Sequence, residues 1–435
     1  MSSVIAIIGR PNVGKSTLFN RLSRSRTALV DDQPGITRDR LYAFVSWNEI
    51  DLTLVDTGGF DESDKDLLQK LVQGQVLKAV DEADRIIFVV DGREGIVPGD
   101  EEIIDILRRS HKKFFVAVNK IDGPELDGLV TDFYRLGVDN AYPVSASHGY
   151  GIWDFMEQLT SDLPRVVREE DEGNRIRVAI VGRPNVGKSS LINCILGSDR
   201  LLVSEMPGTT RDSVDTLCTW KEKEYIFIDT AGIRRKGKTR EKIEKFSVIK
   251  ALRSLDRCHV AVIVLDASSG VIDQDARICG YALERGRAII LAVNKWDLVK
   301  RDREKKLFLE GTLERHLKFV AFSPDLRVSA LTGEGVSRLF EKMDRLYDQF
   351  CKRIGTGELN RVVEEMLQEK APPKTGRHRL KLFYVTQTGI RPPTFVVFVN
   401  RPDMVHFSYE RYITNQLRAR LGLEHTPVKV IFRKK

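Results

Sequence analysis

A nine-residue segment occurs twice in this 435-residue chain and constrains its fold more than any other feature. It reads GRPNVGKST at 9–17 and GRPNVGKSS at 182–190, and each copy follows an apolar run. A glycine-rich loop between a strand and a helix gathers backbone N–H groups and a helix N-terminus around a phosphate. The repeat therefore predicts two phosphate-binding domains in tandem, and its long spacing excludes a short-period solenoid.

Four further motifs follow each loop in the same order. The first copy continues with PGITRD at 34–39, DTGG at 56–59, NKID at 119–122 and SAS at 145–147, and the second with PGTTRD, DTAG, NKWD and SAL. The carboxylate of NKxD can accept hydrogen bonds from N1–H and the 2-amino group of guanine, and adenine offers neither donor. Each copy is therefore predicted to be a complete site for GTP and GDP.

The residues that we predict to bind the nucleotide form two matching sets. The first set is Gly9, Arg10, Pro11, Asn12, Val13, Gly14, Lys15, Ser16, Thr17, Asp56, Thr57, Gly58, Gly59, Asn119, Lys120, Asp122, Ser145 and Ala146. The second set is Gly182, Arg183, Pro184, Asn185, Val186, Gly187, Lys188, Ser189, Ser190, Asp229, Thr230, Ala231, Gly232, Asn294, Lys295, Asp297, Ser329 and Ala330.

Within these sets the residue types indicate separate roles. Lys15 and Lys188 are expected to reach the β- and γ-phosphates, and the backbone amides of Ala146 and Ala330 to bond the guanine carbonyl oxygen. Because Mg²⁺ prefers oxygen ligands, its predicted ligands are Ser16, Thr37 and Asp56 in the first site and Ser189, Thr210 and Asp229 in the second. Thr37 and Thr210 lie in loops that loss of the γ-phosphate would release.

One departure from many signalling GTPases concerns the residue after DxxG, where a glutamine orients the attacking water. Phe60 and Ile233 stand there and cannot hold a water. Asn12 and Asn185 resemble the asparagine by which some GTPases hold a potassium ion near the phosphates. An asparagine chosen only for turn geometry is the open alternative. The predicted catalytic residues are Asn12, Lys15, Thr37, Asn185, Lys188 and Thr210.

Charge is unevenly distributed along the chain. The net charge is +8, yet residues 351–435 carry 17 Lys+Arg against 7 Asp+Glu, and residues 1–350 carry 53 against 55. A basic tail indicates an acidic polymer as partner. The five cysteines form no CxxC pair, and no apolar run approaches the ~18 residues of a membrane span. We therefore expect a cytoplasmic protein with free thiols and no membrane partner.

Apolar runs alternate with helical patterns in both copies, which predicts an α/β fold with mostly parallel sheets. The predicted domains are 1–162, an acidic linker at 163–175, a second domain at 176–352 and a small basic α+β domain at 353–435. In the last domain we predict a helix at 358–370, strands at 378–387 and 394–400, a helix at 408–421 and a strand at 427–433.

Two such units, an acidic linker and a basic tail resemble the Der (EngA) family of bacterial ribosome-assembly GTPases. The segment DTAGIRRKGKTREKIEKFSVIKAL at 229–252 and the ending TPVKVIFRKK are also similar to that family. The resemblance covers essentially the whole chain. It implies two tandem P-loop GTPase domains, a KH-like C-terminal domain, and GTP hydrolysis in maturation of the large (50S) ribosomal subunit, with binding to rRNA.

Two basic runs are the candidates for RNA contact: Arg234, Arg235, Lys236 and Lys238 after DTAG, and Lys374, Arg377, Arg379 and Lys381 beside strand aromatics. Solvated surface charge is the alternative for both. A nucleic-acid-binding KH domain normally presents a GxxG loop between two helices, and this sequence has none in a suitable place. Contact through another face, or packing of this domain against a GTPase unit, is therefore expected.

Two other functions remain as alternatives. A membrane-associated oligomerising GTPase would need an amphipathic basic helix or a lipidation signal, and we expect a monomer in solution instead. A tRNA-modification GTPase would have one GTPase unit within a helical domain and a reactive C-terminal cysteine. This chain has two units, and its last cysteine is Cys351.

Overall fold

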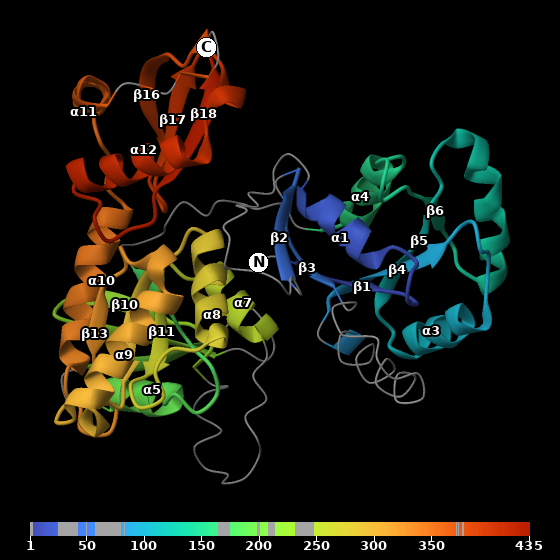
Figure 1. Cartoon of the computed structure of the whole chain (residues 1–435). Helices are drawn as coiled ribbons and strands as arrows, with labels where there is room; N and C mark the ends of the chain where they lie inside the picture. The colour runs from blue at the N-terminus through green and yellow to red at the C-terminus, as the bar shows by residue number, and fades with distance from the viewer. Residues whose placement is uncertain are drawn as a thin grey trace. The chain divides into compact units, whose positions relative to one another are not determined.

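The computed structural model of the chain describes residues 3–24, 42–48, 50–56, 80–81, 83–163, 175–197, 201–207, 214–230, 248–370, 372, 374–375 and 378–435. The chain forms two compact units, Met1–Glu170 and Asp171–Lys435. The first unit contains one α/β domain, and the second contains another α/β domain and the C-terminal domain (Figure 1). Among the described residues, no helix could cross a bilayer.

The first domain is built on a six-stranded sheet of order β2-β3-β1-β4-β5-β6. Its strands are β1 (Ser3–Ile8), β2 (Tyr42–Trp47), β3 (Ile50–Asp56), β4 (Arg85–Asp91), β5 (Lys113–Asn119) and β6 (Ala141–Pro143). Neighbouring strands are parallel except for the antiparallel pair β2 and β3. The helical segments are α1 (Lys15–Arg24), α3 (Pro98–Arg109), the 3-10 segment η1 (Pro124–Leu136) and α4 (Ile152–Thr160).

The second domain repeats this plan with a seven-stranded sheet of order β13-β12-β11-β7-β10-β9-β8. Its strands are β7 (Ile176–Val181), β8 (Leu202–Pro207), β9 (Val214–Trp220), β10 (Lys223–Phe227), β11 (Val260–Asp266), β12 (Ala288–Asn294) and β13 (Asp325–Arg327). Its α-helices are α5 (Lys188–Leu196), α7 (Val248–Arg257), α8 (Asp273–Glu284), α9 (Arg303–His316) and α10 (Val336–Phe350).

Apolar residues on both faces of the strands explain why helices cover both sides of the second sheet. Val178 and Ile180 of β7 pack in one buried cluster with residues of α5 and α10. Ala179 and Val181, which point to the other face, pack in a second cluster with residues of α7, α8 and α9. Strands buried on both faces read as continuous apolar runs, so the predicted α/β architecture is confirmed.

Strands β2, β8 and β9, at the antiparallel end of each sheet, lie outside the continuous apolar runs from which strands are predicted. A strand at or next to the edge of a sheet need not be apolar on both faces, so its apolar signal is weaker. In β9, for example, buried Cys218 alternates with half-buried Leu217 and Thr219. The continuous runs that predict buried parallel strands therefore do not identify these edges.

The C-terminal domain packs two helices, α11 (Thr356–Glu369) and α12 (Phe407–Arg420), on a three-stranded sheet (Figure 1). The sheet has the order β16-β17-β18, with β16 (Leu382–Gly389) antiparallel and β18 (Lys429–Lys434) parallel to β17 (Thr394–Val399). The expected single strand at 378–387 is wrong. β15 (His378–Arg379) pairs with β14 (Lys374–Thr375) in a separate hairpin, and β16 begins only at Leu382.

The C-terminal domain also contacts the end of α10 in the second domain. The N–H of Arg391 donates to the carbonyl oxygen of Phe350 at 3.1 Å, and the N–H of His425 donates to Gln349 Oε1 at 3.0 Å. Lys352 Nζ donates to the carbonyl oxygen of Leu421 at 2.8 Å. These bonds attach the β16–β17 connection and the segment after α12 to the end of α10, whose other face lies in the second domain's core.

The core of the second domain depends on one aromatic ring of α10. Phe340 is 2% exposed, stacks on Trp220 at 5.0 Å between ring centroids and meets Tyr225 edge-on at 5.0 Å. Replacement of Phe340 by alanine removes these contacts and leaves a cavity. We therefore expect Phe340→Ala to lower the free energy of unfolding of this domain by about 3–5 kcal/mol.

Urea denaturation followed by far-UV circular dichroism measures this effect. Leu307→Ala is the matched control, because Leu307 is 60% exposed on α9, and a change within about 0.5 kcal/mol is expected there. Equal effects of the two substitutions would contradict the role given to Phe340.

Candidate nucleotide-binding sites

The two phosphate loops have the same backbone shape. Each begins where a parallel strand ends, at Ile8 or Val181, and each is followed by a helix that starts at the lysine. Asn12 and Asn185 adopt left-handed conformations with φ of 65° and 64°. Asparagine tolerates this region better than most residues. The turn explanation for these asparagines is therefore supported, and it does not conflict with a ligand role for their exposed side chains.

Close backbone approach explains the glycines of these loops. A Cβ at Gly9 would lie 2.3 Å from the carbonyl oxygen of Val89. A Cβ at Gly14, where φ is 94°, would lie 2.3 Å from Asn119 Nδ2, and one at Gly187 would lie 2.4 Å from Asn294 Nδ2. Any larger residue would push each loop away from the neighbouring strands.

The lysine of each loop is held over the loop by a backbone oxygen. Lys15 Nζ donates to the carbonyl oxygen of Arg10 at 2.6 Å, and Lys188 Nζ donates to that of Arg183 at 2.7 Å. An ammonium group carries three donors. The bond to the loop therefore orients the lysine and is compatible with donation to a phosphate oxygen.

Asp56 and Asp229 lie at the strand edge that bears the phosphate loops. Asp56 ends β3 and pairs in register with Ile7 of β1, two residues before Gly9. Burial raises the pKa of Asp229, and the charge of Lys250 only partly offsets it. A divalent cation beside this carboxylate would lower its pKa again. Hydroxyl and carboxylate oxygens are the ligands that Mg²⁺ prefers, so the residues present fit a magnesium site.

A buried asparagine connects the phosphate loop to the Ser-Ala loop in each domain. Asn119 Nδ2 donates to the carbonyl oxygen of Val13 at 2.8 Å, and its Oδ1 accepts from the N–H of Ala146 at 2.9 Å. Asn294 makes the corresponding bonds to Val186 and Ala330, both at 2.9 Å. A bond from either alanine N–H to guanine would have to share this donor, so that role remains a prediction.

The lysine of each NKxD motif pairs with an aspartate at the end of the preceding parallel strand. Lys120 pairs with Asp91, and Lys295 Nζ lies 2.6 Å from Asp266 Oδ2. Burial acts to raise the pKa of Asp266, but the hydrogen bonds from Lys295 and Ser268 outweigh it and the pKa is lowered. These pairs fix the direction of both lysine stems.

The two aspartates that we predict to recognise guanine have different surroundings. Asp122 Oδ1 accepts from Ser145 Oγ at 2.6 Å and lies 3.0 Å from His148 Nδ1, and Asp122 Oδ2 lies 2.5 Å from Arg93 Nη2. The Ser145 hydroxyl, followed by His148, holds the pKa of Asp122 below its ordinary value. In the second domain, Asp297 Oδ1 accepts from Ser329 Oγ at 2.6 Å.

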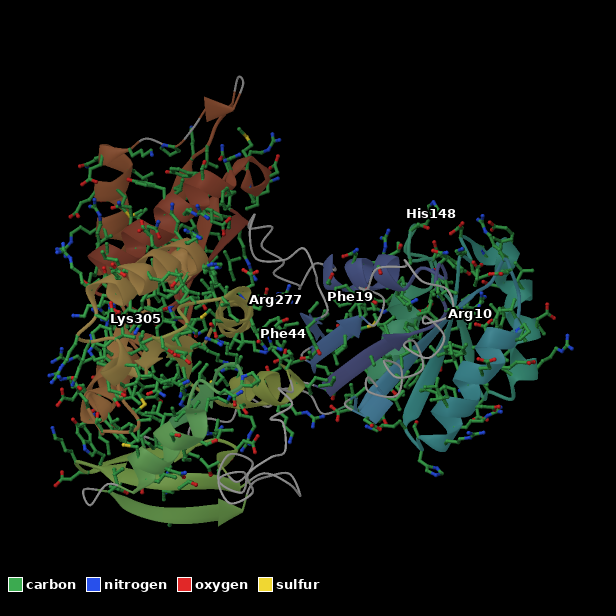
Figure 2. All side chains as sticks on the ribbon, turned by 60° about the horizontal axis from the view of Figure 1, so that its bottom comes forward. Arg10, Phe19, Phe44, His148, Arg277 and Lys305 are labelled. Carbon is green, nitrogen blue, oxygen red and sulfur yellow. The ribbon has the colours of Figure 1, made fainter. Side chains whose placement is uncertain are left out.

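The sequence reasoning missed the partners of two loop arginines. Arg10 Nε donates to Asp100 Oδ1 at 2.8 Å, and Arg183 Nε donates to Asp275 Oδ2 at 3.2 Å. Both aspartate side chains are fully buried near the start of a helix. Asp100 and Asp275 occupy matching positions in the repeat, as do Arg10 and Arg183. This correspondence is the sequence signal from which the two pairs could have been predicted. Figure 2 labels Arg10 and, in the loop after β6, His148 on the first domain.

Several predicted residues lie outside the described part of the chain. They are Thr37, Thr57, Gly58, Gly59, Phe60, Thr210, Ala231, Gly232, Ile233, Arg234, Arg235, Lys236, Lys238 and Arg377. Lys374 and Arg379 lie in β14 and β15, of which the backbone alone is described. The remaining predicted residues of each nucleotide set come from the carboxyl ends of parallel strands and the loops that follow them. Ligands of doubly wound sheets bind at this edge.

Comparisons with known families cover most of the chain. A family described as a 50S ribosome-binding GTPase matches residues 4–120 and 177–295. A second family, described as the KH-domain-like C-terminal domain of EngA bacterial GTPase enzymes, matches residues 353–433. The predicted pair of GTPase domains and the KH-like C-terminal domain are thus confirmed.

Full-length relatives agree with these matches. The GTPase Der of Syntrophobacter fumaroxidans is 51% identical over 436 residues, which are 99% of this chain and 98% of that protein. The GTPase Der of Syntrophotalea carbinolica is 48% identical over 432 residues, with 99% and 98% covered. A solved structure of the G domain of the T. maritima FeoB iron transporter is 26% identical over 39% of this chain and 97% of that domain. Its TM-score of 0.27 is too low to support any argument about this chain.

The guanine assignment can be tested by changing the acceptor. An asparagine in place of Asp122 or Asp297 presents one amide donor and one acceptor, which suits xanthine better than guanine. We expect Asp122→Asn and Asp297→Asn each to lower GDP affinity and raise XDP affinity at its own site by at least about 10²-fold. Titration with fluorescent nucleotides measures both affinities. Unchanged GDP preference at both sites would refute the assignment.

Proposed function

This chain belongs to the GTPase Der family, and from that premise we propose that its GTP cycle controls binding to rRNA in the maturing large (50S) ribosomal subunit. The chain is a GTPase, and its matched family is described as ribosome-binding. We place the domain boundaries at 162, 175 and 352 and expect a monomer in the cytoplasm. The observation that carries the RNA proposal is a surface of the basic C-terminal domain.

This surface combines aromatic and basic side chains on one face of the three-stranded sheet. Tyr384, Phe398 and Arg433 are aligned in register across β16, β17 and β18, so their side chains share a face. Tyr384 is 41% exposed and stacks on Phe398 with 4.4 Å between ring centroids. Arg433 is exposed at the end of this row.

Further residues extend the surface beyond this row. A register shift between Leu382 and Tyr384 leaves Phe383 exposed as well, at 45%, and Lys435 Nζ lies 4.9 Å from its ring centroid. Lys381 is exposed and hydrogen-bonds through its N–H to Asn400 at 2.9 Å. Exposed rings beside cations are suited to unpaired bases, which stack on aromatic side chains while Lys and Arg contact phosphates. We call Lys381, Phe383, Tyr384, Phe398, Arg433 and Lys435 the aromatic-basic face.

We assign the predicted nucleotide, Mg²⁺ and catalytic residues to the GTP cycle. Ser16, Thr37 and Asp56, with Ser189, Thr210 and Asp229, would hold Mg²⁺, which neutralises the phosphate charge in phosphoryl transfer. The lysines of the phosphate loops would bind the transferred phosphoryl group. The basic segment from Arg234 to Lys238, after the second DxxG motif, would connect hydrolysis to RNA contact, because it follows residues that bind the γ-phosphate.

Sedimentation with purified 50S subunits tests the ribosomal proposal. We expect tighter binding with a GTP analogue than with GDP, by a coupling of roughly 1–3 kcal/mol. With ~6 phosphate contacts, affinity should fall about 10³-fold between 50 and 200 mM salt. Neutralising Arg234, Arg235, Lys236 and Lys238 to Gln should remove most of the nucleotide dependence. Binding that ignores nucleotide in both proteins would refute the switch.

The aromatic-basic face is tested separately. Lys381→Gln, Arg433→Gln and Lys435→Gln together should weaken 50S binding in both nucleotide states and reduce the salt dependence by about three phosphate contacts. Arg303→Gln, Lys305→Gln and Lys318→Gln remove the same charge from exposed positions of the second domain and serve as the control. Equal losses for the two sets would show that only net charge matters.

A potassium ion is the proposed substitute for the missing water-orienting glutamine. It would bind near Asn12 and Asn185 and stabilise charge that develops on the phosphates. GTP hydrolysis should therefore be faster in K⁺ than in Na⁺ at equal ionic strength, and Asn12→Ala with Asn185→Ala should remove the difference. Steady-state phosphate release measures both rates, and equal rates in the two salts for the unaltered protein would refute this proposal.

A further inference from the structure

The guanine-recognition carboxylates of the two domains differ in how many donors already occupy them. We propose that Arg93 and His148 form a latch on Asp122 that guanine must displace, and that the second site has no such latch. The latch would make guanine binding weaker at the first site than at the second. This proposal rests on the assignment of Asp122 and Asp297 to guanine recognition.

The argument begins with the acceptor capacity of Asp122. An ionised carboxylate offers about four lone-pair positions. Ser145 Oγ at 2.6 Å and His148 Nδ1 at 3.0 Å occupy Oδ1, and Arg93 Nη2 at 2.5 Å occupies one position on Oδ2. Guanine requires two acceptor positions, for N1–H and the 2-amino group. Only about one remains, so Arg93 or His148 has to move before both bonds can form.

Arg93 and His148 are held in place by more than Asp122. The N–H of Arg93 donates to Asp91 Oδ1 at 3.0 Å, and Arg93 Nε donates to the carbonyl oxygen of Lys120 at 3.3 Å. The N–H of His148 donates to Ser145 Oγ at 3.0 Å. The same loop is bound from α1, because Arg21 Nε donates to the carbonyl oxygen of Ala146 at 2.6 Å. Release of the latch therefore moves residues that are already ordered.

The second domain has different side chains at the positions that correspond to Arg93, His148 and Arg21. Ser268 replaces Arg93, and its Oγ donates to Asp266 Oδ1 at 2.6 Å instead of to the recognition aspartate. Thr332 replaces His148, and its N–H donates to Ser329 Oγ at 3.2 Å. Cys194 replaces Arg21 and lines a shallow pocket of about 630 Å³ with Ala330 and Leu331.

These replacements leave the second carboxylate more accessible to guanine. Within the described part of the second domain, Asp297 accepts one side-chain hydrogen bond, from Ser329 at 2.6 Å. About three of its lone-pair positions thus remain for the base. Leu331, in the adjoining loop, is 86% exposed. The same fold therefore presents two guanine sites, and guanine must displace more hydrogen-bond donors at the first than at the second.

The expected change in GDP affinity is modest because the side chains of the latch are partly exposed to solvent. The Arg93 side chain is 60% exposed and that of Asp122 is 25% exposed, so water and salt screen their attraction. Arg93→Ser with His148→Thr, which copies the second site, should therefore tighten GDP binding at the first site by roughly threefold to tenfold. Ser268→Arg with Thr332→His should weaken GDP binding at the second site by a similar factor.

The nucleotide affinity of each site is measured in the full-length protein after nucleotide binding at the other site has been removed by a substitution. Lys188→Ala removes phosphate binding from the second site, and Lys15→Ala removes it from the first. Calorimetric titration with GDP and with IDP, whose base lacks the 2-amino group, then gives two affinities for each variant. IDP needs one acceptor position and GDP needs two, so removal of the latch should favour GDP and raise the ratio of GDP to IDP affinity in Arg93→Ser with His148→Thr. A general loosening of the loop would instead weaken both nucleotides alike. Arg93→Lys, which retains the cation, should stay close to the unaltered protein.

Two outcomes would overturn the latch. One is unchanged or weaker GDP binding in Arg93→Ser with His148→Thr while circular dichroism shows an intact fold. The other is a GDP to IDP ratio that does not change. If Asp122→Asn still shifts the first site toward XDP in either case, the guanine assignment survives and the latch alone is wrong. If Asp122→Asn causes no such shift, the assignment on which the latch rests fails too.

Discussion

The nucleotide sites of this protein depend on one buried amide in each GTPase domain. Asn119 and Asn294 are 3% and 2% exposed, and each joins a phosphate loop to a Ser-Ala loop that lies far away in the sequence. Loss of this side chain would leave a buried carbonyl oxygen and a buried N–H without partners, which is costly. The phosphate end and the base end of each site are therefore held in one geometry, and the glycines beside the amide supply the space that it needs.

A shared backbone does not make the two sites equivalent. The phosphate loops agree in their left-handed asparagines and in the bond that orients their lysines. The predicted base ends differ, because Asp122 accepts hydrogen bonds from three side chains, whereas Asp297 accepts one from the side chains that the structure describes. Duplication can thus preserve the geometry that binds phosphates while side chains in the adjoining loops adjust the affinity for the base. Two sites in one chain could then respond to different GDP concentrations.

We propose that the C-terminal domain connects nucleotide chemistry with a polyanion. Its backbone bonds to Phe350 and Gln349 attach it to α10, which packs in the core of the second GTPase domain. Its sheet carries the aromatic-basic face, where rings and cations are exposed together. An attachment to a GTPase domain at one side and a chemically distinct surface at another are the features expected of a domain that transmits a state to a partner.

The sequence by itself determined the elements whose signal is local. The phosphate loops, the NKxD motifs, the continuous apolar strands and the basic tail follow from residue types and their spacing, because a turn requires particular backbone angles and a buried strand requires apolar side chains on both faces. The edge strands β2 and β8 and the neighbouring β9 were not predicted, since strands near a sheet edge need not be apolar on both faces.

Only the tertiary structure decided which distant side chains meet. The bond from Asn119 to Val13, the pair of Arg10 with Asp100 and the approach of Arg93 to Asp122 all join different strand ends. The row of Tyr384, Phe398 and Arg433 likewise depends on the pairing of three strands. Strand order and register set these contacts, and a shift of one residue in register would turn each side chain to the opposite face of its sheet.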